Sequence, residues 1–299
     1  MQAFAGLAWW ICVFTLDPVR EATLGGADPV LVAAVDLPLF VAASALAARG
    51  LRWACWIAVP WTLIVALALV IGATLTGKAG WGALAMLAAS AGGVSAWLLM
   101  TQSRIPAERV LIGPLGFRVA ASRARGRQVA RTFAQLTAFW VFFLLLLPGA
   151  IGWFEMRWGL RLVPTSSPVA SFVLALGAIL LLLASALGIW AAITMSTLGD
   201  GTPLPSATAR RLVIAGPYLF VRNPMALAGI VQAAGVGLML GSWLVVLYAL
   251  CGAAYWNWLV RPFEEQELAQ RFGAPYNDYR TRVRCWIPTP PSRAGGPAA

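Results

Sequence analysis

Long apolar stretches separated by short polar segments dominate this sequence, and they limit it to a small set of folds. Of its 299 residues, 60% are hydrophobic and 11% are charged. A soluble domain usually carries about 25% charged residues. One globular core cannot bury so much apolar surface, so lipid must be the solvent for much of it. The sequence therefore predicts a multi-pass integral membrane protein.

The expected membrane spans follow from the length of each apolar stretch, because a spanning helix needs about 20 such residues. The first stretch is short but lacks the basic segment and cleavage pattern of a signal peptide, which favours a short membrane helix. The last stretch is too long for one span, and Gly235, Gly237, Gly241 and Ser242 near its middle predict a helical hairpin. The expected spans are roughly 3–16, 29–48, 54–76, 81–101, 132–154, 168–196 and two within 225–260, eight in all.

The positions of the basic residues support this count. With both termini inside, the inner segments 49–53, 102–131, 197–224 and 261–299 hold 18 of the 22 lysines and arginines. This asymmetry is what the positive-inside rule requires, whereas seven spans would place the arginine-rich C-terminus outside. We therefore predict an all-α membrane bundle with both termini cytoplasmic, in an inner or plasma membrane. The net charge of +11 then reflects topology and contact with lipid headgroups, and no nucleic-acid partner is expected.

These patterns divide the chain into four parts. We expect a four-span unit at 1–101, a basic interfacial linker at 102–131, a C-terminal membrane unit at 132–288 and a disordered tail at 289–299. The linker contains RVLIGPLGFR, which is similar to the later RRLVIAGPYLFVR. A duplicated active-site loop is therefore an alternative to an interfacial linker.

Missing residue types exclude several kinds of chemistry. The chain has no histidine, which removes histidine general bases, histidine metal ligands and Ser-His-Asp triads. Its four cysteines show no paired spacing, so we expect neither disulfides nor a metal site. These cysteines are Cys12, Cys55, Cys251 and Cys285.

Asp36 lies inside the second expected span, where an acid is a functional candidate by default. Pro38 follows closely and should interrupt the helix. A carboxylate at Asp36 could then cap the backbone N–H groups exposed by the break. The sequence favours this structural role over a functional one.

Two polar segments differ from the apolar stretches around them, namely 199–225 and 261–288. In the first, Arg222 stands before Asn223-Pro224, where a helix should begin. Backbone N–H groups at a helix start bind anions, and a guanidinium group can donate two parallel hydrogen bonds to a carboxylate.

Carboxylates and a tyrosine complete this candidate site. Glu264 and Glu265 should open the C-terminal helix and accept hydrogen bonds from ribose hydroxyls or an ammonium group. Tyr218 offers a flat face and a hydroxyl. The set would complement a ligand that carries a carboxylate, an ammonium group, a ribose, an adenine and a sulfonium. On chemical grounds alone, an arginine and two glutamates at a membrane surface more often form a solvated face or an ion pair.

The same two segments carry family motifs. GPYLFVRNPM at 216–225 resembles the GPYxxxR(H/N)P signature of the isoprenylcysteine carboxyl methyltransferase and phospholipid methyltransferase superfamily. Residues 264–279 match its EExxLxxxFGxxYxxY pattern. The resemblance covers about 199–288, and both motifs stand in the expected order around the predicted hairpin. It implies that 132–288 is a methyltransferase unit and that the cofactor is S-adenosylmethionine. It also implies a lipophilic acceptor, such as an isoprenylcysteine carboxylate or a phospholipid amine.

The resemblance also assigns site residues. Asn223 stands where the family often has histidine, Ala226 replaces a frequent aromatic residue, and Arg261 is displaced by one position from the family's functional arginine. Arg261, Glu264 and Glu265 are implied to be catalytic. The implied cofactor-binding residues are Arg210, Leu212, Val213, Gly216, Tyr218, Arg222, Asn223, Pro224, Met225, Ala226, Glu264 and Glu265.

Two other functions remain open at this point. An NADPH-dependent membrane reductase of the sterol-reductase type shares a related loop, but the EExxLxxxFGxxYxxY continuation favours methyl transfer. A non-catalytic transporter or scaffold should place polar residues in several spans, and few are present besides Asp36. The sequence does not identify the acceptor, the oligomeric state or the role of the first four spans.

Overall fold

The computed structural model describes residues 1–106, 125–162, 168–199 and 209–290. Every regular element in these ranges is a helix, as the all-α prediction requires. The RVLIGPLGFR segment with most of the expected linker, and most of the expected disordered tail, lie outside the described residues.

Six described helices are long and apolar enough to cross a membrane. A bent helix pair near the N-terminus would make a seventh, and the 17-residue helix Pro224–Leu240 is shorter than the others. Each expected span from 29–48 to 168–196 falls on one of these six helices. By length and composition the described helices thus give six spans, or seven with the bent pair, and the expected total of eight is not reached. The six are Pro29–Ala48, Arg52–Thr76, Gly80–Gln102, Val129–Arg157, Val169–Leu198 and Trp243–Phe272.

The helices group into two compact units. One comprises Met1–Pro106 with Trp153–Arg161, and the other comprises Ala107–Gly152 with Leu162–Ala299. The boundary falls inside α8 (Leu147–Arg157), so a single helix contributes residues to both units.

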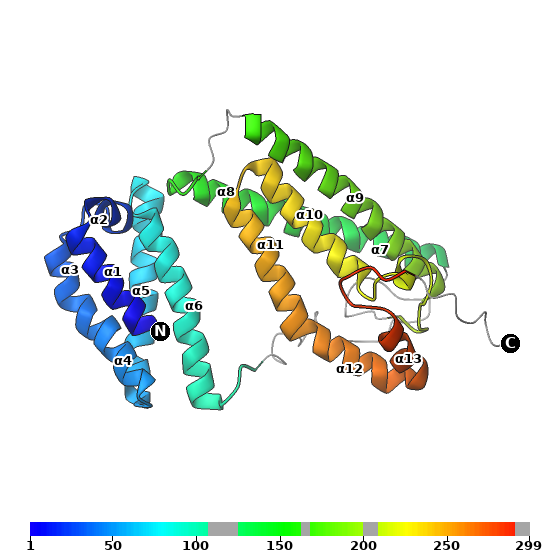
Figure 1. The fold of residues 1–299 in the computed structure, drawn as a ribbon, viewed down its shortest axis with the longest axis horizontal. Coiled ribbons are helices and arrows are strands. Elements are labelled where there is room, and N and C mark those ends of the chain that lie inside the picture. The colour runs from blue at the N-terminus through cyan, green and yellow to red at the C-terminus, as the bar shows by residue number, and fades with distance from the viewer. Residues whose placement is uncertain (107–124, 163–167, 200–208, 291–299) are drawn as a thin grey trace. The chain divides into compact units, whose positions relative to one another are not determined.

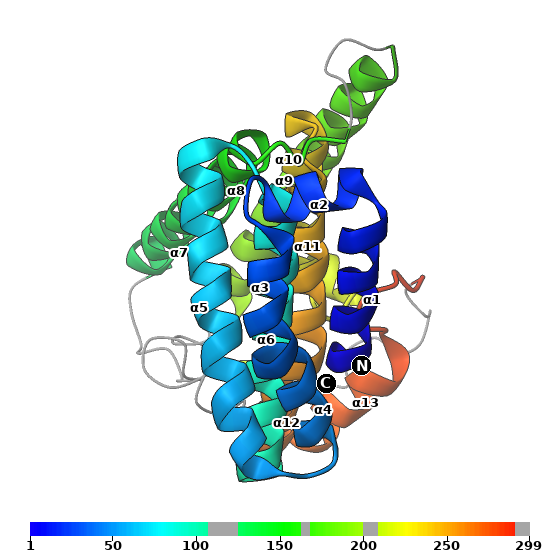
Figure 2. The ribbon, with the colours of Figure 1, turned by 90° about the vertical axis from the view of Figure 1, so that its left-hand side faces the viewer.

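Apart from the short helix Asp17–Leu24, the helices in the first unit lie roughly parallel or antiparallel to one another (Figure 2). The predicted first span, 3–16, coincides with the 14-residue helix Gln2–Thr15. A second helix begins at Asp17-Pro18 and bends by 116° from it. Proline at the first turn favours a new helix start, which explains the break. The elements are α1 (Gln2–Thr15), α2 (Asp17–Leu24), α3 (Pro29–Asp36), a π-helical segment η1 (Leu37–Ala42), α4 (Ala43–Ala48), α5 (Arg52–Thr76) and α6 (Gly80–Gln102).

Asp36 connects three helices of this unit. Only 4% of it is exposed, and its two carboxylate oxygens accept hydrogen bonds from the Nε1 atoms of Trp10 and Trp61, each at 2.8 Å. The expectation that Asp36 caps a helix broken at Pro38 is wrong, because its side chain makes no cap bond. The chain continues instead through η1, since a wider turn accommodates a proline that has no N–H to donate.

The second unit is built around α9 (Pro168–Leu198), α10 (Pro224–Leu240) and α11 (Trp243–Tyr255) (Figure 1). The predicted hairpin is present: Gly241 ends α10 with a φ of +58°, and the Ser242 hydroxyl accepts a hydrogen bond from the Val245 N–H at the start of α11. Glycine adopts positive φ without strain, and serine is a favoured N-cap. The elements are α7 (Arg125–Phe139), π-helical η4 (Trp140–Leu146), the first part of α8, α9 (Pro168–Leu198), the 3₁₀ turn η6 (Gly216–Leu219), α10 (Pro224–Leu240), α11 (Trp243–Tyr255), π-helical η7 (Trp256–Val260), α12 (Arg261–Phe272) and α13 (Ala274–Arg282).

Glycines bring the backbones of α9 and α10 into direct contact. A Cβ atom added at Gly177 would lie 2.7 Å from the carbonyl oxygen of Gly235, and one added at Gly235 would lie 2.8 Å from that of Gly177. Neither position can hold a side chain without moving the helices apart. The start of α10, where the first polar segment ends, is thereby held close to α9.

Candidate cofactor site

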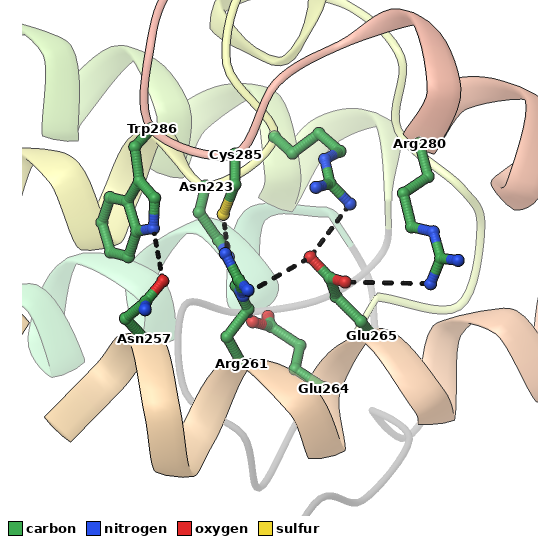
Figure 3. Close-up of polar contacts among 9 residues, drawn as sticks. Asn223, Asn257, Arg261, Glu264, Glu265, Arg280, Cys285 and Trp286 are labelled. Atoms are coloured by element: carbon green, nitrogen blue, oxygen red, sulfur yellow. Dashed lines mark hydrogen bonds and ion pairs between the residues drawn. The ribbon is translucent and has the colours of Figure 1, made fainter. Parts of the chain in front are cut away.

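The two polar segments of the second unit lie against each other. The Arg222 N–H donates a hydrogen bond to the Arg284 carbonyl oxygen at 3.0 Å. The Tyr279 hydroxyl donates to the Tyr218 carbonyl oxygen at 2.7 Å. Residues on either side of the α10–α11 hairpin therefore meet at one place, and the charged side chains of α12 face that place (Figure 3).

Gly216 fixes the first segment onto α9. Its φ is +57°, and an added Cβ would lie 2.8 Å from the Thr194 Oγ1 and 3.1 Å from the Trp190 Nε1. A side chain is excluded there by backbone conformation and by the close approach of α9. The glycine of the family motif thus positions the η6 turn that carries Tyr218.

Three of the predicted cofactor residues precede this turn. Leu212 packs against a cluster that contains Tyr276, and Val213 is buried beside Tyr218. Both therefore have packing contacts that hold the site together. Arg210 is exposed, and its backbone N–H donates a hydrogen bond to the Gly199 carbonyl oxygen at 2.7 Å.

Glu265 lies among three guanidinium groups, which come from the segment before α10, from α12 itself and from α13. Its Oε1 is 2.9 Å from the Arg222 Nη1 and 3.9 Å from the Arg261 Nε, and its Oε2 is 3.8 Å from the Arg280 Nη1 (Figure 3). The side chains of Glu265 and Arg222 are only 18% and 14% exposed. Glu265 is therefore a shared counter-ion that orients the arginines.

Glu264 has a different environment. Its Oε2 accepts a hydrogen bond from the Asn223 Nδ2 at 3.4 Å, and Asn223 also donates to the Cys285 Sγ at 3.8 Å. The apolar part of the helix Trp243–Phe272 ends at Val260, and Glu264 lies beyond it in the polar helix α12. Burial raises the pKa of Glu264 to about 7, and although the Asn223 hydrogen bond lowers it, nearby Glu265 adds to the rise. This carboxyl group can exchange a proton near neutral pH.

Three buried donors in the site lack a hydrogen-bond acceptor within the described part of the chain. They are the Tyr218 hydroxyl, the Arg222 Nε and the Arg261 Nε. A buried donor without an acceptor costs about 1–3 kcal/mol. Burial, followed by the negative charge of Glu264, raises the pKa of Tyr218 well above its usual value, so its hydroxyl keeps its proton. The site therefore offers donors to a ligand that carries acceptors.

The start of α10 supplies further donors. Asn223 occupies the N-cap position, but its side chain makes no cap bond and faces Glu264 instead. Pro224 opens the helix and is buried, Met225 packs beside Tyr218, and Ala226 is half-buried. The first N–H groups of α10 thus have no side-chain cap.

Sequence reasoning missed several residues that complete this arrangement. Arg280 and Cys285 contact Glu265 and Asn223, and the Trp286 Nε1 donates a hydrogen bond to the Asn257 Oδ1 at 2.9 Å. Asn257 lies in η7, an interruption of regular helical geometry that often marks functional sites. The sequence does carry one signal for Asn257, since it is a polar residue inside an otherwise apolar stretch.

Comparisons with known proteins concern this same part of the chain. Residues 172–275 match the family model described as phospholipid methyltransferase. No curated protein and no solved structure gives a significant match. The matched range runs from α9 to the start of α13 and contains Arg222, Glu264 and Glu265. Such a domain implies methyltransferase activity at a membrane. Residues 172–275 therefore form a phospholipid methyltransferase domain, within the isoprenylcysteine and phospholipid methyltransferase superfamily.

Proposed function

We propose that this protein transfers a methyl group from S-adenosylmethionine to a lipophilic acceptor held in the membrane. The main support is the meeting of the two polar segments around Glu265, inside the matched methyltransferase domain. The distribution of basic residues supports a cytoplasmic location for this site and for both termini. The first four helical spans form a separate unit of the proposed enzyme.

The residues present fit such a cofactor. Buried donors at Tyr218 and Arg222, with the uncapped start of α10, suit its carboxylate and hydroxyl oxygens. Glu264 suits its ammonium group or a ribose hydroxyl. When bound, S-adenosylmethionine supplies a methyl group on a positively charged sulfur. Leu212, Val213 and Met225 pack beside these polar groups and, with the half-buried Ala226, complete the proposed binding surface.

The protein's own residues would contribute mainly alignment. Glu265 holds Arg222 and Arg261 in fixed positions, which restricts the orientation of a bound ligand. A carboxylate acceptor needs no base, whereas an ammonium acceptor must first lose a proton. Glu264 is suited to receive that proton because its pKa is about 7.

Incubation with defined lipids tests this proposal. Purified protein in nanodiscs containing phosphatidylethanolamine, or an isoprenylcysteine lipid, is expected to produce S-adenosylhomocysteine and a labelled lipid from methyl-labelled S-adenosylmethionine. NADPH should not be oxidised under the same conditions. Oxidation of NADPH without release of S-adenosylhomocysteine would assign a reductase instead. If a full membrane lipid extract yields neither S-adenosylhomocysteine nor oxidised NADPH, the proposal that this protein is an enzyme of either kind is contradicted.

The affinity for S-adenosylmethionine is expected to fall as the pH is lowered through 7. Only the ionised form of Glu264 can pair with an ammonium group, and with a pKa of about 7 that form becomes scarce at lower pH. Between pH 8 and pH 6 the dissociation constant should rise about tenfold, as expected for one titrating group. Isothermal titration calorimetry over this range provides the measurement.

Two glutamine variants separate the possible causes of that pH dependence. Glu264→Gln should bind weakly and almost independently of pH in this range. Glu267→Gln is the matched control, because Glu267 pairs with Arg271 on the same helix and its loss leaves Glu264 free to titrate. Its affinity should therefore still fall as the pH is lowered, with a midpoint at slightly lower pH, since the charge of Glu267 helps to raise the pKa of Glu264. An unaltered profile in Glu264→Gln would show that another group titrates.

A further inference from the structure

The first unit contains a cavity that the methyl-transfer site does not use. Its volume is about 380 Å³, and its walls come from α1, α3, η1, α5 and α6. This size falls within the roughly 300–1,000 Å³ that ligand pockets occupy. The lining is mostly apolar, and small residues such as Gly6, Ala85, Ala89 and Gly92 leave the space open.

The cavity is elongated along α6. Its lining residues on that helix run from Gly82 to Gly92, a rise of about 15 Å at 1.5 Å per residue. Ala85 and Gly92 are exposed, so the cavity opens to the surroundings of the bundle. A single hydrocarbon chain matches this shape and lining.

Asp36 is the sole charged side chain among the lining residues. Its oxygens are held by the indole N–H groups of Trp10 and Trp61, and no described lysine or arginine forms an ion pair with it. Two neutral donors orient a carboxylate but leave its negative charge without a counter-ion. A charge inside a membrane bundle normally has a partner of opposite sign. Trp9 also lines the cavity, and indole faces attract cations.

We propose that this cavity binds an amphiphile with one ammonium group and one hydrocarbon chain. The ammonium group lies beside Asp36, and the chain follows the apolar wall along α6. This site is independent of the proposed methyl transfer, since every lining residue belongs to the first unit.

Gly92 provides a way to fill the cavity without disturbing the helix packing. A Cβ added at Gly92 meets no atom within 4 Å, whereas one added at Gly6 would lie 2.7 Å from the Phe40 ring. Gly72 on α5 is equally free of neighbours but does not line the cavity. Gly92→Leu therefore blocks the proposed site, and Gly72→Leu is its matched control.

Calorimetric titration of the full chain in phosphatidylcholine nanodiscs tests the proposal, with empty nanodiscs as the blank. Dodecyltrimethylammonium is expected to bind saturably and about tenfold or more tightly than dodecanol. Dodecyl sulfate should show no saturable binding. Gly92→Leu should weaken binding of the cation about tenfold or more, whereas Gly72→Leu should retain the native affinity.

Asp36→Asn should remove the preference for the ammonium compound over the alcohol. If that variant fails to fold, the three headgroups compared on the native protein still decide the question. Equal affinity for the cation and the alcohol, no saturable binding above the blank, or native affinity in Gly92→Leu would each overturn the proposal.

Discussion

Alanine at position 222 is expected to weaken S-adenosylmethionine binding about 100-fold or more, while the protein still inserts into the membrane. Losing a buried charged partner typically costs about 2–5 kcal/mol of binding free energy. Arg222 stands at the start of α10 and is 14% exposed, with its Nη1 at 2.9 Å from Glu265. Its replacement removes both the proposed carboxylate contact and one counter-ion of Glu265.

Binding of labelled S-adenosylmethionine to purified Arg222→Ala in nanodiscs measures this effect. Arg282→Ala is the matched control, because Arg282 is exposed and its Nε donates a hydrogen bond to the Asp278 carbonyl oxygen one turn earlier, away from Glu265 in sequence and in its described contacts. Arg222→Lys should give an intermediate affinity, since lysine keeps the positive charge but cannot donate two parallel hydrogen bonds to one carboxylate. Native affinity in Arg222→Ala would remove Arg222 from the cofactor site.

Replacing Glu265 with alanine should have the second large effect, on stability as well as on binding. Three guanidinium groups would then lie near one another without their shared counter-ion. Breaking a buried ion pair by removing one partner costs about 3–5 kcal/mol. We expect Glu265→Ala to lower the unfolding temperature clearly and to expose the segment around Arg284 to proteolysis.

Arg280→Ala separates this effect from the loss of an ordinary surface ion pair. Arg280 is 49% exposed and lies 3.8 Å from Glu265, so its removal should cost no more than about 1 kcal/mol. Thermal unfolding of both variants in the same detergent gives the comparison. If the two variants unfold at similar temperatures, Glu265 does not organise the site.

The helical hairpin shows which features of this fold can be predicted from sequence. Gly241 and Ser242 act locally, because positive φ and capping depend on residue type, and the turn stands where they predict it. Asp36 shows the limit. Its partners Trp10 and Trp61 lie 26 and 25 residues away, so no local pattern indicates that they meet around one carboxylate.

The same distinction applies to the candidate site. Arg222, Glu264 and Glu265 stand in motifs, and the structure brings them together as the sequence reading required. The difference between the two glutamates depends on tertiary contacts. Glu265 faces three arginines, whereas Glu264 faces Asn223. Two adjacent glutamates in a sequence do not show which of them pairs with the arginines.

The close approach of Gly177 and Gly235 bears on what keeps α9 and α10 associated in hydrocarbon. Lipid tails are as apolar as leucine side chains, so excluding water contributes no attraction between two immersed helices. Cohesion then depends on dispersion forces, which are strong only where atoms touch. By letting two main chains touch, these glycines give the pair an adhesion that bulkier residues, however apolar, would weaken by holding the helices apart.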